Sequence, residues 1–152
     1  MSKVKKSLVV ILLAIFGAIV AQAQIVQPVH WSYASKKISS TEAVVFIKAT
    51  IDEGWHVYSQ HVKEGGPVKT TFTFKASPDY KLIGETAEPK PITRMEKAFG
   101  MDVSFFENSV IFQQKVKLNK GKTTVNGTLE YMTCNDQKCL PPDDIDFSIS
   151  VQ

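Results

Sequence analysis

Residues 130–147 read EYMTCNDQKCLPPDDIDF and contain the only two cysteines of the chain, Cys134 and Cys139. A β-strand pattern leads into this segment and another leads out of it, so both cysteines belong to one turn between two strands. No other part of the sequence brings reactive side chains so close together. We therefore interpret this turn as a candidate redox site that the rest of the chain holds in place.

Short strand patterns recur on both sides of the turn, with turn residues between them and no long segment of helical period. Strands are expected at residues 24–35, 42–51, 55–62, 70–75, 80–83, 103–106, 109–118, 123–131 and 145–151. Eight or nine short strands at such regular spacing are typical of a β-sandwich. The sequence predicts an all-β fold in one domain, with no internal repeat and no linker.

Three segments of the sequence do not follow a simple strand pattern, and each needs its own interpretation. A turn at residues 119–121 is preferred over one at Asn126-Gly127, because it leaves the alternation of residues 123–131 unbroken. Residues 84–93 contain two prolines and are expected to be extended without pairing. Residues 94–100 are expected to form one helical turn or a loop.

The N-terminus has the features of a secretory signal peptide. Three lysines precede an apolar run at residues 8–20, and Ala21-Gln22-Ala23 follows with the small residues that signal peptidase prefers. The apolar run is short for a membrane span. We predict cleavage after Ala23, which leaves residues 24–152 as the mature domain; an uncleaved N-terminal anchor is the alternative.

Cleavage also changes the net charge. The whole chain has 18 Lys+Arg and 15 Asp+Glu, and residues 1–23 contain three lysines and no acid, so the mature domain is neutral. A neutral domain without a clustered basic face gives no case for nucleic-acid binding. We expect no stable membrane anchor after cleavage and a monomeric protein. Export places the thiols where disulfides form.

Two roles for the cysteines remain open. A structural disulfide is the simpler one, but a ring this small stabilises a protein by only about 2 kcal/mol on the chain-entropy model. It would also join the ends of a turn that the two strands already hold. The turn is polar, and accessible sulfur is what thiol–disulfide exchange needs. These features favour a redox-active pair over a structural one.

Metal binding is the third reading of the same residues. His56, His61 and Met132 could join the two cysteines, but zinc sites usually have a second pair of ligands at short spacing. His56 and His61 are five residues apart in a strand pattern and should point to opposite faces. We therefore expect no metal and no cofactor.

Two blocks of sequence resemble the N-terminal periplasmic domain of the thiol–disulfide interchange protein DsbD. The first is EGWHVYSQ at residues 53–60, similar to a Gly-aromatic-x-x-Tyr-x-Gln strand of that family. The second runs from YMTC at residues 131–134 to CLPP at residues 139–142. Their order and separation also fit, and the resemblance covers the whole mature chain.

The resemblance implies an immunoglobulin-like β-sandwich with a redox-active cysteine pair. By this likeness Cys139 forms the mixed disulfide with a partner and Cys134 resolves it. His56, Tyr58 and Tyr131 match the site region, although an aromatic residue is more usual where His56 stands. The family's partners are thioredoxin-fold proteins and a membrane thiol electron donor, so the implied role is a periplasmic protein thiol–disulfide oxidoreductase.

The sequence also departs from the family pattern. The loop between the cysteines is one residue shorter, and aligning Gly100 with the family's cap loop puts Ala98 at the position of the shielding phenylalanine. Phe99 is its neighbour, and it is either the cap or a core residue. The chain has no multi-span membrane region, so we expect its electron donor to be another polypeptide. The rival function is a non-enzymatic immunoglobulin-like binding module with a structural disulfide.

Overall fold

The computed structural model describes residues 26–152, so the predicted signal peptide and its cleavage site lie outside the described residues. Within this range all pairing between strands is antiparallel, and there are more strands than the sequence patterns indicated. The strands are β1 (Val29–Lys37), β2 (Glu42–Ile51), β3 (Trp55–Tyr58), β4 (Thr71–Phe74), β5 (Tyr80–Ala87), β6 (Ile92–Glu96), β7 (Met101–Glu107), β8 (Ser109–Leu118), β9 (Thr123–Tyr131), β10 (Thr133–Asn135) and β11 (Asp143–Val151). In the same range no helix has the length and apolar character needed to cross a bilayer.

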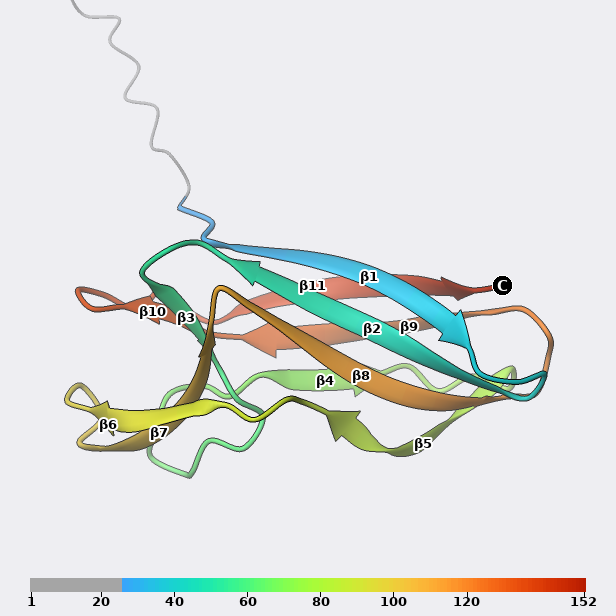
Figure 1. The fold of residues 1–152 in the computed structure, drawn as a ribbon, viewed down its shortest axis with the longest axis horizontal. Helices are drawn as coiled ribbons and strands as arrows, with labels where there is room; N and C mark the ends of the chain where they lie inside the picture. Colours follow the sequence, from blue (N-terminus) through green and yellow to red (C-terminus); the bar gives the residue numbers. More distant parts are fainter. Residues whose placement is uncertain (1–25) are drawn as a thin grey trace, which may run out of the picture.

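These strands form three sheets. Two of them, β1-β2-β8-β5 and β11-β9-β4, make the long body of the molecule, and the third, β10-β3-β7-β6, lies at one end (Figure 1). The core between the two long sheets explains why the strands form where they do. On β8, for example, every second side chain is buried, and lysines occupy exposed positions between them. The predicted β-sandwich is thus confirmed.

The third sheet arises because two strands of the first sheet continue past a break. β2 pairs with β8 in the first sheet. β3 follows β2 after the turn that contains Gly54, and it pairs with β7, the strand that directly precedes β8. On the other side of the break Asn108 adopts a left-handed conformation with φ 62°, which asparagine tolerates better than most residues. The paired chains change direction at this corner.

β10 reaches the third sheet from the opposite side of the sandwich. β9 pairs with β11 and β4, and after Met132 the chain leaves that sheet and pairs with β3. The third sheet therefore has one face on the main core, where Val57 and Phe106 are buried. Its other face carries a second, smaller cluster that includes Tyr58 and Cys134.

The structure corrects the expectation for residues 84–93. β5 continues to Ala87 across an irregularity in its pairing with β8, and residues 92 and 93 pair with β7 as the start of β6. Gln114 stabilises the irregularity because its buried amide donates to the carbonyl oxygen of Ile83 (3.2 Å) and accepts from Thr86 Oγ1 (2.9 Å). The proline-containing linker at residues 88–91 lies between the two strands.

Two neighbouring expectations also change. Residues 94–96 belong to β6, and the turn that follows is closed by the N–H of Gly100, which donates to the carbonyl oxygen of Glu96 at 2.8 Å. The strand expected at residues 55–62 ends at Tyr58. The preference for a turn at residues 119–121 is confirmed, since Asn126 and Gly127 lie inside β9.

Gly127 leads to a prediction about packing. A Cβ atom at this position would overlap the ring of Phe147 and lie 2.5 Å from the carbonyl oxygen of Thr73. We expect Gly127→Ala to lower the free energy of unfolding by about 1–3 kcal/mol, as overpacking of a core does. Gly121→Ala is the matched control, because a Cβ there meets nothing within 4 Å. Urea unfolding of both variants measures the difference; equal stability would contradict the packing described here.

Candidate functional site

The two cysteines form a disulfide, with Cα atoms 4.0 Å apart. The turn between them is organised by Asn135, whose side-chain oxygen accepts hydrogen bonds from the backbone N–H groups of Gln137 (2.9 Å) and Lys138 (2.8 Å). Asparagine commonly stabilises turns in this way. The N–H of Asn135 also donates to the carbonyl oxygen of Lys138. The turn is therefore held by its own hydrogen bonds as well as by the disulfide.

The two sulfur-bearing residues differ in their exposure. Cys134 is 2% exposed and packs in the small cluster with Tyr58, Val103 and Phe105. Cys139 is exposed to solvent. An attacking thiolate from another protein can therefore reach the sulfur of Cys139 far more readily than that of Cys134.

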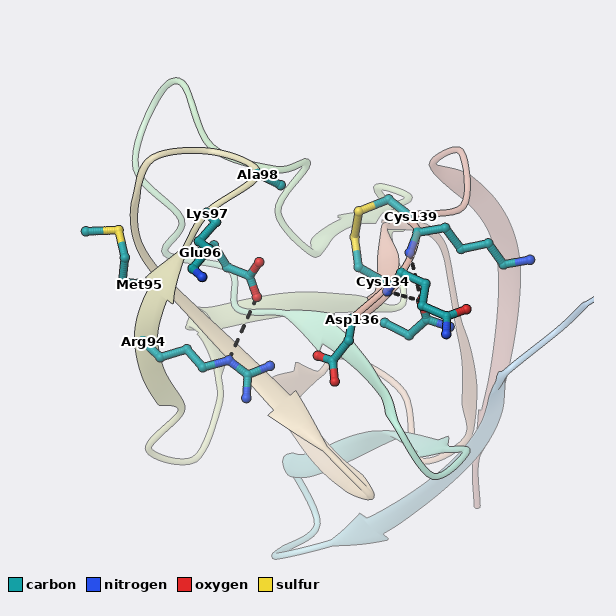
Figure 2. A pocket seen from close by; sticks show the side chains of 11 residues that line it. Arg94, Met95, Glu96, Lys97, Ala98, Cys134, Asp136 and Cys139 are labelled. Atoms are coloured by element: carbon teal, nitrogen blue, oxygen red, sulfur yellow. Dashed lines mark hydrogen bonds and ion pairs between the residues drawn. A yellow bond between two sulfur atoms is a disulfide. The ribbon is translucent and has the colours of Figure 1, made fainter.

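The disulfide lies beside a cleft of about 500 Å³. One wall is formed by residues 94–98, at the end of β6, and the other by residues 134–139 (Figure 2). Arg94 and Glu96 on the first wall lie across the cleft from the disulfide and Asp136 on the second. The cleft is thus lined by charged groups of both signs.

His56 and Tyr58, both predicted to lie at the site, stand two residues apart on β3. His56 is the direct pairing partner of Cys134 on β10, and its Nε2 atom lies 3.1 Å from the hydroxyl of Tyr58 in a hydrogen bond. The imidazole also packs 4.8 Å from the ring of Phe105. β3 therefore presents both side chains on the face of the sheet that carries Cys134.

Burial determines the protonation of both groups. Burial, the larger cause, and the positive charge of Arg94 together lower the pKa of His56 to about 4, while Asp136 acts in the opposite direction. Burial also raises the pKa of Tyr58 well above its usual range, and Glu96 adds to this shift. At neutral pH the imidazole is therefore uncharged and the phenol protonated.

Sequence reasoning missed the charged residues of the cleft. Glu96 Oε1 lies 3.8 Å from His56 Nε2, and the guanidinium of Arg94 lies 3.9 Å from Glu96 and 3.5 Å from Glu107. Arg94 also stacks 4.4 Å over the ring of Phe105. The signal was present in the period of two that places residues 94 and 96 on one face of a strand, but this segment was expected to be a loop or a helical turn.

The remaining site candidates occupy different places. Phe99 is partly buried against the small cluster, with its ring 6.4 Å from that of Tyr58, whereas Ala98 lines the cleft. Tyr131 lies in the main core, 5.2 Å from the ring of Trp31, and the structure does not bring it to the cluster with Cys134. His61 is on an exposed loop. In the described range no three His, Cys, Asp or Glu side chains are placed to hold a metal ion.

Solved structures with the same fold share little sequence with this chain. The reduced N-terminal domain of DsbD from Neisseria meningitidis superposes with a TM-score of 0.53 at 17% identity, covering 84% of this chain and 90% of that one. The N-terminal periplasmic domain of ScsB from Proteus mirabilis gives 0.60 at 18% identity, covering 86% and 48%. A complex of the DsbD and PilB N-terminal domains from Neisseria meningitidis gives 0.54 at 15% identity, covering 82% and 87%. These likenesses confirm the predicted immunoglobulin-like β-sandwich.

The sequence itself gives the family. No curated protein matches the chain. In contrast, the family described as "Thiol:disulfide interchange protein DsbD, N-terminal" matches residues 22–150, which include both sequence blocks, the disulfide and all strands but the final residue of β11. The family and the disulfide-forming pair together support thiol–disulfide exchange as the chemistry of the site. The chain therefore belongs to the family of DsbD N-terminal domains.

Proposed function

We propose that this protein is an exported thiol–disulfide oxidoreductase that relays reducing equivalents from a membrane thiol donor to periplasmic thioredoxin-fold proteins. The observation that carries the proposal is the unequal exposure of the pair: Cys139 is open to a partner and Cys134 is 2% exposed behind it. Such an arrangement separates the sulfur that meets partners from the sulfur that resolves the intermediate.

The exchange follows from this geometry. A donor thiolate attacks the Cys139 sulfur, the Cys134–Cys139 bond breaks, and Cys134 leaves as a thiolate that takes up a proton. A second donor thiol then releases the donor as a disulfide and leaves both cysteines reduced. Transfer to an acceptor disulfide runs the same steps in reverse, with Cys139 attacking first. The chemistry uses thiols alone and needs no cofactor.

The comparisons support the choice of partners and compartment. A DsbD N-terminal domain from Neisseria meningitidis forms a complex with the PilB N-terminal domain, and the ScsB domain from Proteus mirabilis is periplasmic. By analogy, a partner of this protein docks over the cleft and reaches Cys139. His56 and Tyr58 then lie buried behind the disulfide, on the same face of the sheet as Cys134.

The reduction potential of the pair tests this function. We expect a value between about −270 and −120 mV, the range of redox proteins, and the same far-ultraviolet circular dichroism for both forms. Equilibration in glutathione and dithiothreitol buffers measures the potential. A potential below about −300 mV, or unfolding on reduction, would instead identify a structural disulfide and favour the binding-module alternative.

Cysteine variants test the separate roles of the two sulfurs. Cys134→Ala leaves Cys139 exposed without its resolving partner, so we expect it to accumulate a mixed disulfide with glutathione or with a thioredoxin-fold protein. Cys139→Ala leaves only a buried thiol and should accumulate far less. Mass spectrometry of the two variants after the same incubation gives the ratio; equal trapping would contradict the assignment.

Phe99 provides a test of the loop at residues 97–100. An aromatic pair such as Phe99 and Tyr58 contributes about 1 kcal/mol, so Phe99→Ala should free the loop and speed reduction by dithiothreitol about fivefold. Phe46→Ala is the control, because Phe46 is also partly buried but lies on β2, in another sheet. An unchanged rate in Phe99→Ala would mean that Phe99 does not shield the disulfide.

A further inference from the structure

The burial of Cys134 creates a problem that the exchange must solve. Cys134 attacks as a thiolate when it resolves a mixed disulfide at Cys139, yet it is only 2% exposed and packs on one side against Tyr58, Val103 and Phe105. An unpaired charge is costly among such groups. The thiol therefore needs a nearby group that takes its proton as the new sulfur–sulfur bond forms.

His56 is placed to be that group. It lies directly opposite Cys134 in the antiparallel pair of β3 and β10, and the Cβ atoms of such opposite residues are about 4.5–5.5 Å apart on one face of the sheet. The imidazole is held by the hydrogen bond of Nε2 to Tyr58 and by packing against Phe105. With its pKa lowered to about 4, the imidazole is uncharged at any pH above about 5, which is the form that a general base must have.

The charged groups around His56 come from every element that packs against it. Glu96 on β6 has a carboxylate oxygen 3.8 Å from Nε2, and Arg94 on the same strand faces it with a positive charge. Glu107 on β7 is the pairing partner of His56 and holds Arg94 at 3.5 Å. Asp136 follows β10 and favours the protonated imidazole. Arg94 opposes a positive charge on the imidazole more strongly than Asp136 favours it, and Glu96 has the carboxylate oxygen that lies near Nε2.

We propose that His56 accepts the proton of the Cys134 thiol during resolution of the mixed disulfide, with Glu96 stabilising the resulting imidazolium. This inference rests on the proposed function. In the step, Cys134 loses its proton to the imidazole and its sulfur bonds to that of Cys139. The bond between Cys139 and the partner breaks, and the partner leaves as a thiolate. The imidazolium then returns its proton to solvent through the cleft.

A thiol placed beside a base, with a third group behind the base, is a recurring arrangement for activating nucleophiles. A role for His56 as a base differs from a structural role in one measurable respect, the dependence of the resolution rate on pH. A neutral base removes the proton at a rate that does not depend on pH above its own pKa. Without such a base, the rate follows the thiolate fraction and rises about tenfold per pH unit.

The test uses the reduced protein and the aromatic disulfide 5,5′-dithiobis(2-nitrobenzoate) in a stopped-flow spectrometer. Attack by Cys139 releases the first coloured thiolate, at a rate that depends on reagent concentration. Attack by Cys134 on the mixed disulfide releases the second, at a rate that does not. We expect the second rate constant of the unmodified protein to be nearly constant between pH 5.5 and pH 7.5.

In His56→Phe the second rate constant should rise about tenfold per pH unit and be about 100-fold lower at pH 6, the smaller contribution expected of a general base. His56→Gln, which keeps a polar side chain, should behave like His56→Phe and serves if the latter does not fold. Glu96→Gln should keep the plateau at a lower rate. His61→Phe is the matched control and should leave both phases unchanged, because His61 lies on an exposed loop.

Two results would overturn the inference. One is a plateau that survives in both His56 variants; the other is a slowing that is equal at every pH, which would assign His56 a packing role. Either result can be told apart from a failure of the proposed function. If the reduced unmodified protein unfolds or shows no second phase, the exchange itself is absent. If the unmodified protein shows a second phase and the His56 variants have the same pH profile, only the role of His56 is removed.

Discussion

The pairing of β10 with β3 is the constraint on which the site depends. Residues 123–135 belong to two sheets, because the chain leaves β9 after Tyr131 and pairs with β3 in the end sheet from Thr133 onward. This change of sheet places Cys134 opposite His56. It also brings the turn with Cys139 up to residues 94–98, which lie at the other edge of the same sheet, in β6 and the turn that follows it. Without it, the cysteine turn would be an ordinary hairpin at the end of the sandwich.

The third sheet, at the end of the molecule, positions the site because its two faces pack in different clusters. Val57 and Phe106 join the main core and fix the position of the sheet. Tyr58 and Phe105, the next residues on the same strands, belong to the small cluster around Cys134. Successive side chains of a strand point to opposite faces, so β3 and β7 pack on the main core with one face and contribute side chains to the site with the other.

The parts of this structure that follow from local alternation could be predicted, and those that depend on distant pairing could not. The buried face of β9 and the turn at residues 119–121 are visible in the period of the sequence. The likeness to DsbD in the two sequence blocks also indicated the cysteine pair and the positions of His56 and Tyr58. In contrast, β6 contains few apolar residues and follows two prolines, so its segment looked unpaired. Its pairing with β7 depends on the turn before Gly100 and is what brings Arg94 and Glu96 to His56.

The separation of the two clusters also bears on how much of the fold depends on the disulfide. The ring closed by Cys134 and Cys139 is small, and on the chain-entropy model it contributes about 2 kcal/mol. Its turn is also held by the hydrogen bonds of Asn135. The main core lies between the two long sheets and shares no buried residue with the cluster around Cys134. The disulfide therefore lies among a few side chains at one end of the molecule, apart from the apolar surface that stabilises the sandwich.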